Sequence, residues 1–245
     1  MRNDSRNAIL KQLKSTRASG QNKATGDFHR ASLLASNTRT AERRKYDLRK
    51  TLEDLSAVMR SCHSHGEAVS FIDEILQENA IKRCVAWKHP LLDRMELSVI
   101  FKQKKVKYRD SFSGRADFRQ YCAQADLGIT AADAIIEESG TIVVRARRGW
   151  ERATSLLPPV HLVVFEAHQV VPSVRQLPHL LRSFHDENEK LPSAVHLITG
   201  PSRTADIEFN LVLGVHGPKK VYVLAANGFV GEFIRSRPSM PLFLG

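Results

Sequence analysis

The amino-acid sequence predicts an α/β fold in which a mostly parallel sheet is flanked by helices. Short apolar runs rich in β-branched residues alternate with longer runs of helical periodicity, and this alternation is typical of strands joined by crossover helices. Glycine and proline mark breaks between the runs, as at Gly200-Pro201 and Gly217-Pro218. The chain has 245 residues with 42% hydrophobic content, which is enough for a sizeable core in one or two domains.

The expected strands are short apolar segments. The run from Val160 to Glu166 is a strong example, and two prolines precede it. The stretch from Lys102 to Arg109 has five basic residues in eight, so it is expected to be a surface loop or an edge strand. Apolar runs that predict strands occur at residues 83–87, 99–101, 141–145, 160–166, 194–199 and 220–225.

The expected helices have apolar residues spaced three or four apart. Thr130 and Asp133 have the spacing of a capping box, and Gly140 is placed to end that helix in the left-handed conformation. Ser202 or Thr204 is placed to cap a later helix. The predicted helices are residues 5–13, 39–60, 67–79, 130–138, 174–184 and 204–213.

Charge divides the chain into two parts. Residues 1–60 contain 14 Lys/Arg and 6 Asp/Glu, so most of the net charge of +11 belongs to this quarter. We expect a basic, helical or partly mobile N-terminal arm at 1–60 and an α/β domain at 61–245. Such an arm could bind an acidic partner, but it has only two aromatic residues for base stacking. The sequence has no nucleic-acid-binding motif, so no nucleic-acid partner is expected.

Cysteine usage and hydropathy suggest a cytoplasmic protein. Three widely spaced cysteines form neither a disulfide framework nor the set of about four thiolates that an iron–sulfur cluster needs. No apolar run approaches the ~18 residues of a membrane span, and the first residues lack the apolar stretch of a signal peptide. The segment Cys62-His63-Ser64-His65 has no further ligand at a recognised spacing, so no metal site is expected.

The turn that follows residues 194–199 is the strongest candidate for a ligand site. Gly200 allows a close approach of the backbone, and a helix start attracts anions. Asp206 and Glu208 suit that helix end, whereas Arg203 does not. Either a ligand carboxylate or phosphate, or a neighbouring acid, would explain Arg203.

A second candidate is the turn at residues 128–141. Glu138 is either a general base or hydrogen-bond acceptor for a substrate, or a structural carboxylate that binds backbone amides. His216 lies between two glycines, where it either contacts the ligand or is solvated. The sequence has no dinucleotide fingerprint, no Walker loop and no nucleophile elbow.

Several blocks resemble one known family. Residues 127–144, 156–164 and 197–218 are similar, in this order, to the signatures of the lactate utilisation protein C family, the LUD domain. Residues 6–13 resemble its opening helix. The resemblance implies a fold similar to the sugar-phosphate isomerase and CoA-transferase group. It also implies membership of a three-component system that oxidises L-lactate to pyruvate, with iron–sulfur clusters in the two partner subunits and none bound by this chain alone.

The resemblance also assigns motif positions. Ser139 stands where the family commonly has threonine, and Glu137 replaces a small residue. The matching positions are Thr130, Asp133, Glu138, Gly140, Thr141, Gly200, Ser202, Arg203, Thr204, Asp206, Glu208, Gly214, His216 and Gly217.

The leading hypothesis is a pocket between the two turns that binds a small carboxylate or phosphate. Arg203 would pair with the anion, and Glu138 or Asp206 would position or accept protons. One alternative is a stand-alone isomerase or transferase that acts on a phosphorylated or CoA-linked substrate. Another is a non-catalytic scaffold whose basic arm docks the iron–sulfur subunits.

Overall fold

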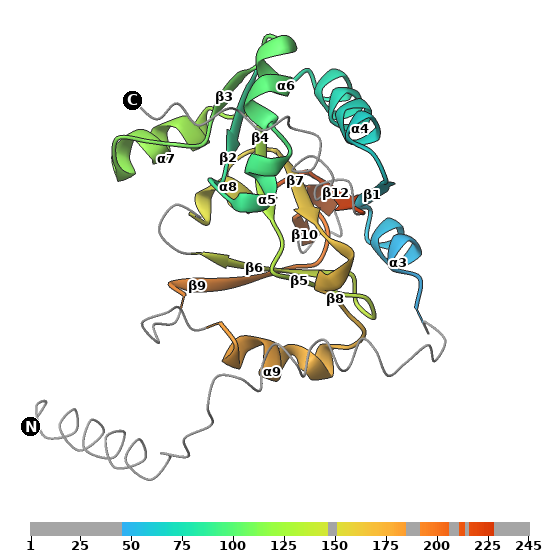
Figure 1. Cartoon of the computed structure of the whole chain (residues 1–245). Helices are drawn as coiled ribbons and strands as arrows, with labels where there is room; N and C mark the ends of the chain where they lie inside the picture. Colours follow the sequence, from blue (N-terminus) through green and yellow to red (C-terminus); the bar gives the residue numbers. More distant parts are fainter. Residues whose placement is uncertain (1–45, 147–150, 185–191, 206–210, 214–215, 228–245) are drawn as a thin grey trace, which may run out of the picture. The chain divides into compact units, whose positions relative to one another are not determined.

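A computed structural model describes residues 46–146, 151–184, 192–205, 211–213 and 216–227. They form two main layers of sheet with helices around them (Figure 1). The larger sheet has six strands, and every neighbouring pair is parallel. Its order is β1 (Val58–Cys62), β12 (Lys220–Ala226), β7 (Val160–Phe165), β4 (Leu127–Ala131), β2 (Arg83–Ala86) and β3 (Lys107–Arg109).

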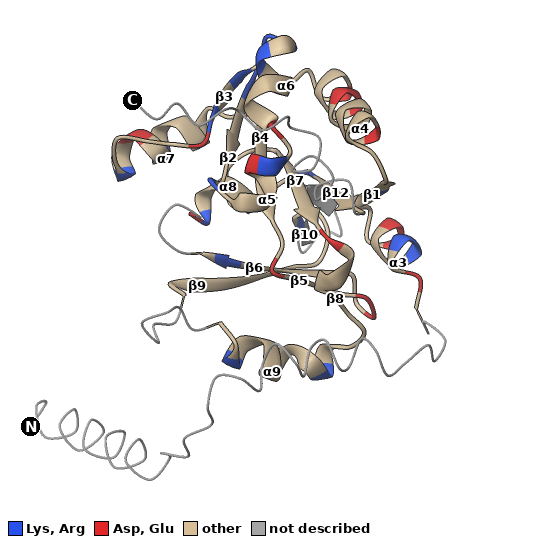
Figure 2. Ribbon diagram, viewed as in Figure 1, with Lys and Arg blue, Asp and Glu red and all other residues tan. Residues whose placement is uncertain are grey.

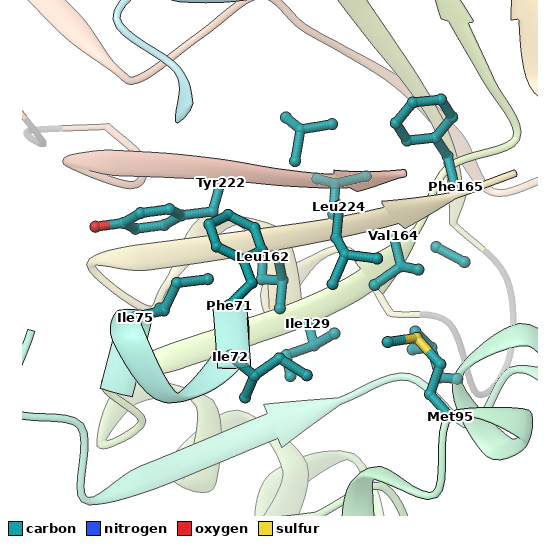
Figure 3. Packing of buried hydrophobic residues seen from close by; sticks show 14 of the residues in the cluster. Phe71, Ile72, Ile75, Met95, Ile129, Leu162, Val164, Phe165, Tyr222 and Leu224 are labelled. Atoms are coloured by element: carbon teal, nitrogen blue, oxygen red, sulfur yellow. The ribbon is translucent and has the colours of Figure 1, made fainter. Parts of the chain in front are cut away.

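The central strands of this sheet are apolar because both of their faces are covered. All residues of β7 and β4 are buried. On one face, Phe71, Ile72 and Ile75 of α4 pack over side chains such as Leu162 and Leu224 (Figure 3). This packing is the main hydrophobic core of the α/β domain.

The other face of the larger sheet carries a closely approaching helix. At Gly128 in β4, an added Cβ would lie 1.9 Å from the carbonyl oxygen of Thr154 in α8. Phe118 and Cys122 of α7 pack with Val85 of β2 on this face. The helices are α3 (Leu48–Asp54), α4 (His65–Glu78), α5 (Pro90–Arg94), α6 (Leu97–Gln103), α7 (Arg115–Ala123), α8 (Ala153–Leu156) and α9 (Leu177–Arg182), with 3₁₀ turns η1 (Ala167–Gln169) and η2 (Val174–Gln176).

A second sheet has the order β8 (Val170–Val171), β5 (Ala134–Ile136), β6 (Thr141–Ala146) and β9 (Ala194–Ile198). The β5–β6 and β6–β9 pairs are antiparallel. One face of this sheet packs against Leu180 and Phe184 in a second apolar cluster. A separate antiparallel pair consists of β10 (Arg203–Ala205) and β11 (Leu211–Leu213).

The predicted fold class is confirmed, because a parallel sheet flanked by helices forms the larger layer. The expected helix at 67–79 corresponds to α4, and the expected strands at 160–166 and 220–225 correspond to β7 and β12. The basic stretch ends in β3, which is an edge strand. The run 194–199 is the strand β9, but it belongs to the second sheet and runs antiparallel to β6.

The helix predicted at 130–138 is wrong. These residues form the end of β4 and all of β5. The capping spacing of Thr130 and Asp133 is not used for capping: Thr130 bonds His161, and Asp133 bonds Arg145. Gly140 has the expected positive φ of 62°, but it lies in the turn between two strands. Long-range side-chain bonds and strand pairing therefore override the local pattern.

Three further helix and strand predictions are corrected. The segment 204–213 is not a single helix, because Arg203 to Ala205 pair with Leu211 to Leu213 as strands. The apolar run 99–101 lies inside α6 and is not a strand. Within the described part of the helix expected at 39–60, α3 ends at Asp54 and residues 58–60 belong to β1.

Residues 46–62, most of which the sequence analysis assigned to the arm, pack with the sheet. Leu52 is fully buried in the main core, and β1 pairs with β12. A division of the chain into two compact units places the boundary between Arg44 and Lys45. The predicted helix at 5–13 lies outside the described residues. Among the described residues, no helix is long and apolar enough to cross a membrane.

Candidate functional site

The two predicted turns meet at one place, and Leu55 lies between them. Strands β6 and β9 pair with Ile142 opposite Ile198, which brings the turns before β6 and after β9 together. A Cβ added at Gly140 would lie 2.7 Å from Leu55 Cδ1, and one added at Gly200 would lie 2.7 Å from the Leu55 carbonyl oxygen. We call the region of residues 55–56, 138–141 and 199–203 the turn junction.

Both backbone conformation and close packing require glycine at positions 140 and 200 of the turn junction. Gly140 has φ 62° and Gly200 has φ 82°, values that L-residues with a side chain adopt at a cost. The clash at Gly200 involves backbone atoms of Leu55, which cannot turn aside as a side chain can. The junction is therefore tightly packed, and a ligand would lie on its surface.

Three hydroxyl groups line the turn junction. The Thr141 hydroxyl is 2.8 Å from that of Ser139 and 2.9 Å from that of Thr199. Thr141 is buried, whereas Thr199 is exposed. Each hydroxyl can donate and accept a hydrogen bond. The exposed Thr199 hydroxyl can therefore bind an anionic or a neutral oxygen of a ligand.

Arg203 is fixed to the end of α3. Its Nη2 donates to the carbonyl oxygen of Leu55 at 2.8 Å and to the hydroxyl of Ser56 at 2.6 Å. A cation suits this position because the last carbonyl groups of a helix carry partial negative charge. The prediction that Arg203 lies at a helix start is wrong, because Arg203 begins the strand β10. Its exposed guanidinium has five N–H donors in all, and these two bonds come from one nitrogen.

Glu138 acts as a backbone cap for the segment that follows β8. Its carboxylate accepts hydrogen bonds from the Ser173 hydroxyl at 2.7 Å and from the Val174 backbone at 3.1 Å. These two bonds, with a smaller contribution from Tyr46, hold the pKa of Glu138 below its usual value. A lowered pKa makes this carboxylate a weak general base at neutral pH, so its geometry favours the structural alternative.

Thr130 lies away from the exposed surface. Its hydroxyl is 2.9 Å from Nε2 of His161, and both side chains are fully buried. Burial, with a smaller effect of His196, lowers the pKa of His161 to about 3. The imidazole is therefore neutral at physiological pH. Its Nδ1 has no hydrogen-bond partner among the described residues.

Asp133 forms a nearly buried ion pair. Its carboxylate accepts from the backbone N–H and the Nε of Arg145, both at 2.6 Å. The Arg145 guanidinium also lies 4.4 Å from the ring centroid of Phe184. These contacts join β5, β6 and the second apolar cluster, so they account for Asp133 through structure.

The structure describes only some of the remaining predicted site residues. The Ser202 backbone N–H donates to the Pro218 carbonyl at 2.9 Å, and Gly217 faces Ser202 closely. Thr204 lies in β10, and His216 is exposed before β12. Asp206, Glu208 and Gly214 lie outside the described residues. The junction thus unites Glu138, Gly140, Thr141, Gly200 and Arg203, while Thr130 and Asp133 bond elsewhere.

The three cysteines are buried within the α/β domain. All three are free. Burial raises the pKa of Cys62 to about 11 and that of Cys122 to about 12, and raises that of Cys84 well above its ordinary value. Burial therefore keeps these thiols protonated at neutral pH. Within the described ranges, no group of three His, Cys, Asp or Glu side chains is placed to hold a metal ion.

Three residues that hold the site or its surroundings together were not predicted from the sequence. Leu55 and Ser56 hold the turn junction together but carry no motif, and nothing local points to them. His161 was overlooked although its signal is readable, because it is a histidine inside the otherwise apolar strand Val160–Phe165. Such a residue is buried with a polar partner, here Thr130.

Comparisons with known proteins point to one family. Residues 46–225 match the family model of the LUD domain. Lactate utilization protein C of Halalkalibacterium halodurans is 37% identical over 147 residues, which cover 60% of this chain and 64% of that protein. The protein of the same name from a Geobacillus species is 32% identical over 187 residues, which cover 71% of this chain and 77% of that protein.

The matched region thus spans just under two thirds of the length of the first of these relatives. Among solved structures, a DUF162 family protein from Deinococcus radiodurans superposes with a TM-score of 0.47 at 20% identity. That superposition covers 80% of this chain and 97% of the other.

Proposed function

Because this chain belongs to the LUD domain family, we propose that it acts in lactate utilization as a subunit of an iron–sulfur-linked system that oxidises L-lactate to pyruvate. The observation that carries the proposal is the similarity to proteins named lactate utilization protein C, which covers 60% of this chain for one relative and 71% for another. The cluster chemistry belongs to two partner subunits. The three buried, protonated thiols of this chain support that assignment. A reducing cytoplasm is the compartment that suits them.

The role of this chain in the system is to bind a small carboxylate at the surface of the turn junction. Arg203 supports this assignment because the end of α3 fixes its guanidinium while leaving it exposed. A carboxylate pairs with such a planar group through two parallel bonds. The exposed Thr199 hydroxyl lies in the same junction and supplies a further donor. Ser202, Thr204 and His216 are the neighbouring candidates for further contacts, and Asp206 would position the ligand.

Growth on lactate tests the proposed function. A strain that lacks this chain should grow poorly with L-lactate as its sole carbon source, and normally with glucose. A plasmid copy should restore growth, and the purified chain should co-purify with two iron–sulfur proteins. Normal growth of the deletion strain on L-lactate would contradict the proposal. Turnover of a phosphorylated or CoA-linked substrate by the isolated chain would favour a stand-alone isomerase or transferase.

Calorimetry tests the ligand site. With pyruvate and L-lactate as probes, Arg203→Ala should lower affinity by roughly 10- to 100-fold, since a hydrogen bond to a charged group contributes about 1.5 to 3 kcal/mol. Arg203→Lys should restore only part of the lost affinity, because lysine lacks the planar guanidinium group that forms two parallel hydrogen bonds. Arg119→Ala is the matched control, since it removes an exposed charge on α7. Equal affinity of Arg203→Ala and wild type would rule out this role.

A further inference from the structure

Two edge strands of this molecule differ in charge. At the β3 edge of the larger sheet, Lys107 and Arg109 follow the basic residues Lys102, Lys104 and Lys105. Figure 2 shows this edge in blue. Lysines on an edge strand discourage pairing with another strand. The β3 edge is therefore protected against unwanted association.

The β9 edge of the second sheet carries no such protection. Among the described residues, β9 is the end of the order β8-β5-β6-β9 and pairs with β6 alone. Residues 192–202 contain no Asp, Glu, Lys or Arg, although 26% of the whole chain is charged. The strand appears uniformly tan in Figure 2. Leu197 is 51% exposed on this strand.

We propose that β9 pairs antiparallel with β9 of a second copy of this chain, about a two-fold axis at His196. An exposed apolar edge is a template for another strand, and two-fold dimers are the commonest closed assemblies. Residues 192–202 contain no charged side chain, so pairing of two β9 strands opposes no like charges within this segment. The uncharged strip around β9 is a place where two copies can approach closely.

The residue pattern of β9 suits pairing with itself. With His196 opposite its counterpart, Val195 lies opposite the partner's Leu197, and Ala194 lies opposite the partner's Ile198. Directly opposed residues of an antiparallel pair share one face of the sheet. On the Val195 face, the second apolar cluster already contains Leu180 and Phe184. Leu197 would therefore extend this cluster across the dimer.

Electrostatics at the axis also permit the pairing. The two His196 side chains would meet there, and two imidazolium groups would repel. Burial, with a smaller effect of the nearby Arg152, lowers the pKa of His196 below its ordinary value. Both imidazoles are therefore mainly neutral at pH 7, so the central pair carries little repulsion.

Sedimentation equilibrium of the full chain tests this assignment. Wild type should show twice the chain mass of 27.6 kDa at micromolar concentration, and Leu197→Lys should show the single mass. Val99→Lys is the matched control, because Val99 is 48% exposed on α6 and receives the same charge. It should remain dimeric.

Amide hydrogen exchange gives a second readout that does not depend on mass. The amides of β9 should exchange at least about tenfold more slowly in wild type than in Leu197→Lys, since local opening then requires separation of the paired edge. A monomeric wild type would overturn the assignment. So would a Leu197→Lys protein that remains dimeric, or β9 amides that exchange equally fast in both proteins.

Discussion

The Gly128→Ala variant is expected to lose at least about 3 kcal/mol of the free energy of unfolding, because overpacking against backbone is costly. The added methyl group would lie 1.9 Å from the Thr154 carbonyl oxygen and 3.0 Å from its carbonyl carbon. It would also approach Pro158 Cγ at 3.2 Å. A flexible side chain could turn aside, but here α8 has to move away from β4. Urea unfolding followed by circular dichroism measures the loss.

A second glycine in the same chain provides the control. Gly66 lies in the first turn of α4, and a Cβ there would be 4.0 Å from the Ser64 hydroxyl. Gly66→Ala should be neutral or more stable by up to about 1 kcal/mol, since alanine is the better helix former. If Gly128→Ala unfolds at the same urea concentration as wild type, α8 does not pack as closely on β4 as the distances indicate.

The Asp133→Ala variant is expected to lose about 2 to 4 kcal/mol, because it leaves a mostly buried arginine without its carboxylate. The side chains of Asp133 and Arg145 are 8% and 20% exposed. The carboxylate also accepts from the Arg145 backbone N–H, which would lose this partner. The residual exposure of Arg145 and its contact with Phe184 limit the loss. Thermal or urea unfolding at pH 7 measures it.

An exposed ion pair provides the control for the Asp133→Ala variant. Arg60 and Glu74 are 44% and 53% exposed, and Glu74→Ala should cost less than about 1 kcal/mol because solvent screens the pair. The double variant Asp133→Ala, Arg145→Met should be more stable than Asp133→Ala alone, since no unpaired charge then remains buried. Equal losses for Asp133→Ala and Glu74→Ala would mean that the Asp133 pair is solvated.

The ends of the predicted elements depended on contacts that lie far away in sequence. The strand β7 and the helix α4 were found from local pattern alone, because an apolar run and an amphipathic repeat each state which faces are buried. The segment after Thr130 has the local pattern of a helix start, because the Thr130 hydroxyl and the Asp133 carboxylate have the spacing of a cap. Their partners His161 and Arg145 are 31 and 12 residues away, beyond what a local pattern describes.

The candidate site was also predicted only in part from the sequence. The sequence identified both glycine turns, and strand pairing confirms that they adjoin. It did not identify Leu55, which occupies the space between them, or the end of α3 that holds Arg203 across 148 positions. The role of Arg203 in ligand binding stays a prediction.

The sequence by itself determined the α/β class, the buried central strands and membership of the family, because these depend on composition, periodicity and ordered motifs. Only the tertiary structure decided that β9 joins a second, antiparallel sheet and that its two turns close on Leu55. The physical reason is that strand pairing and side-chain bonding join residues that are distant in the chain. A local pattern specifies which face of a segment is apolar, but not which segment will cover it.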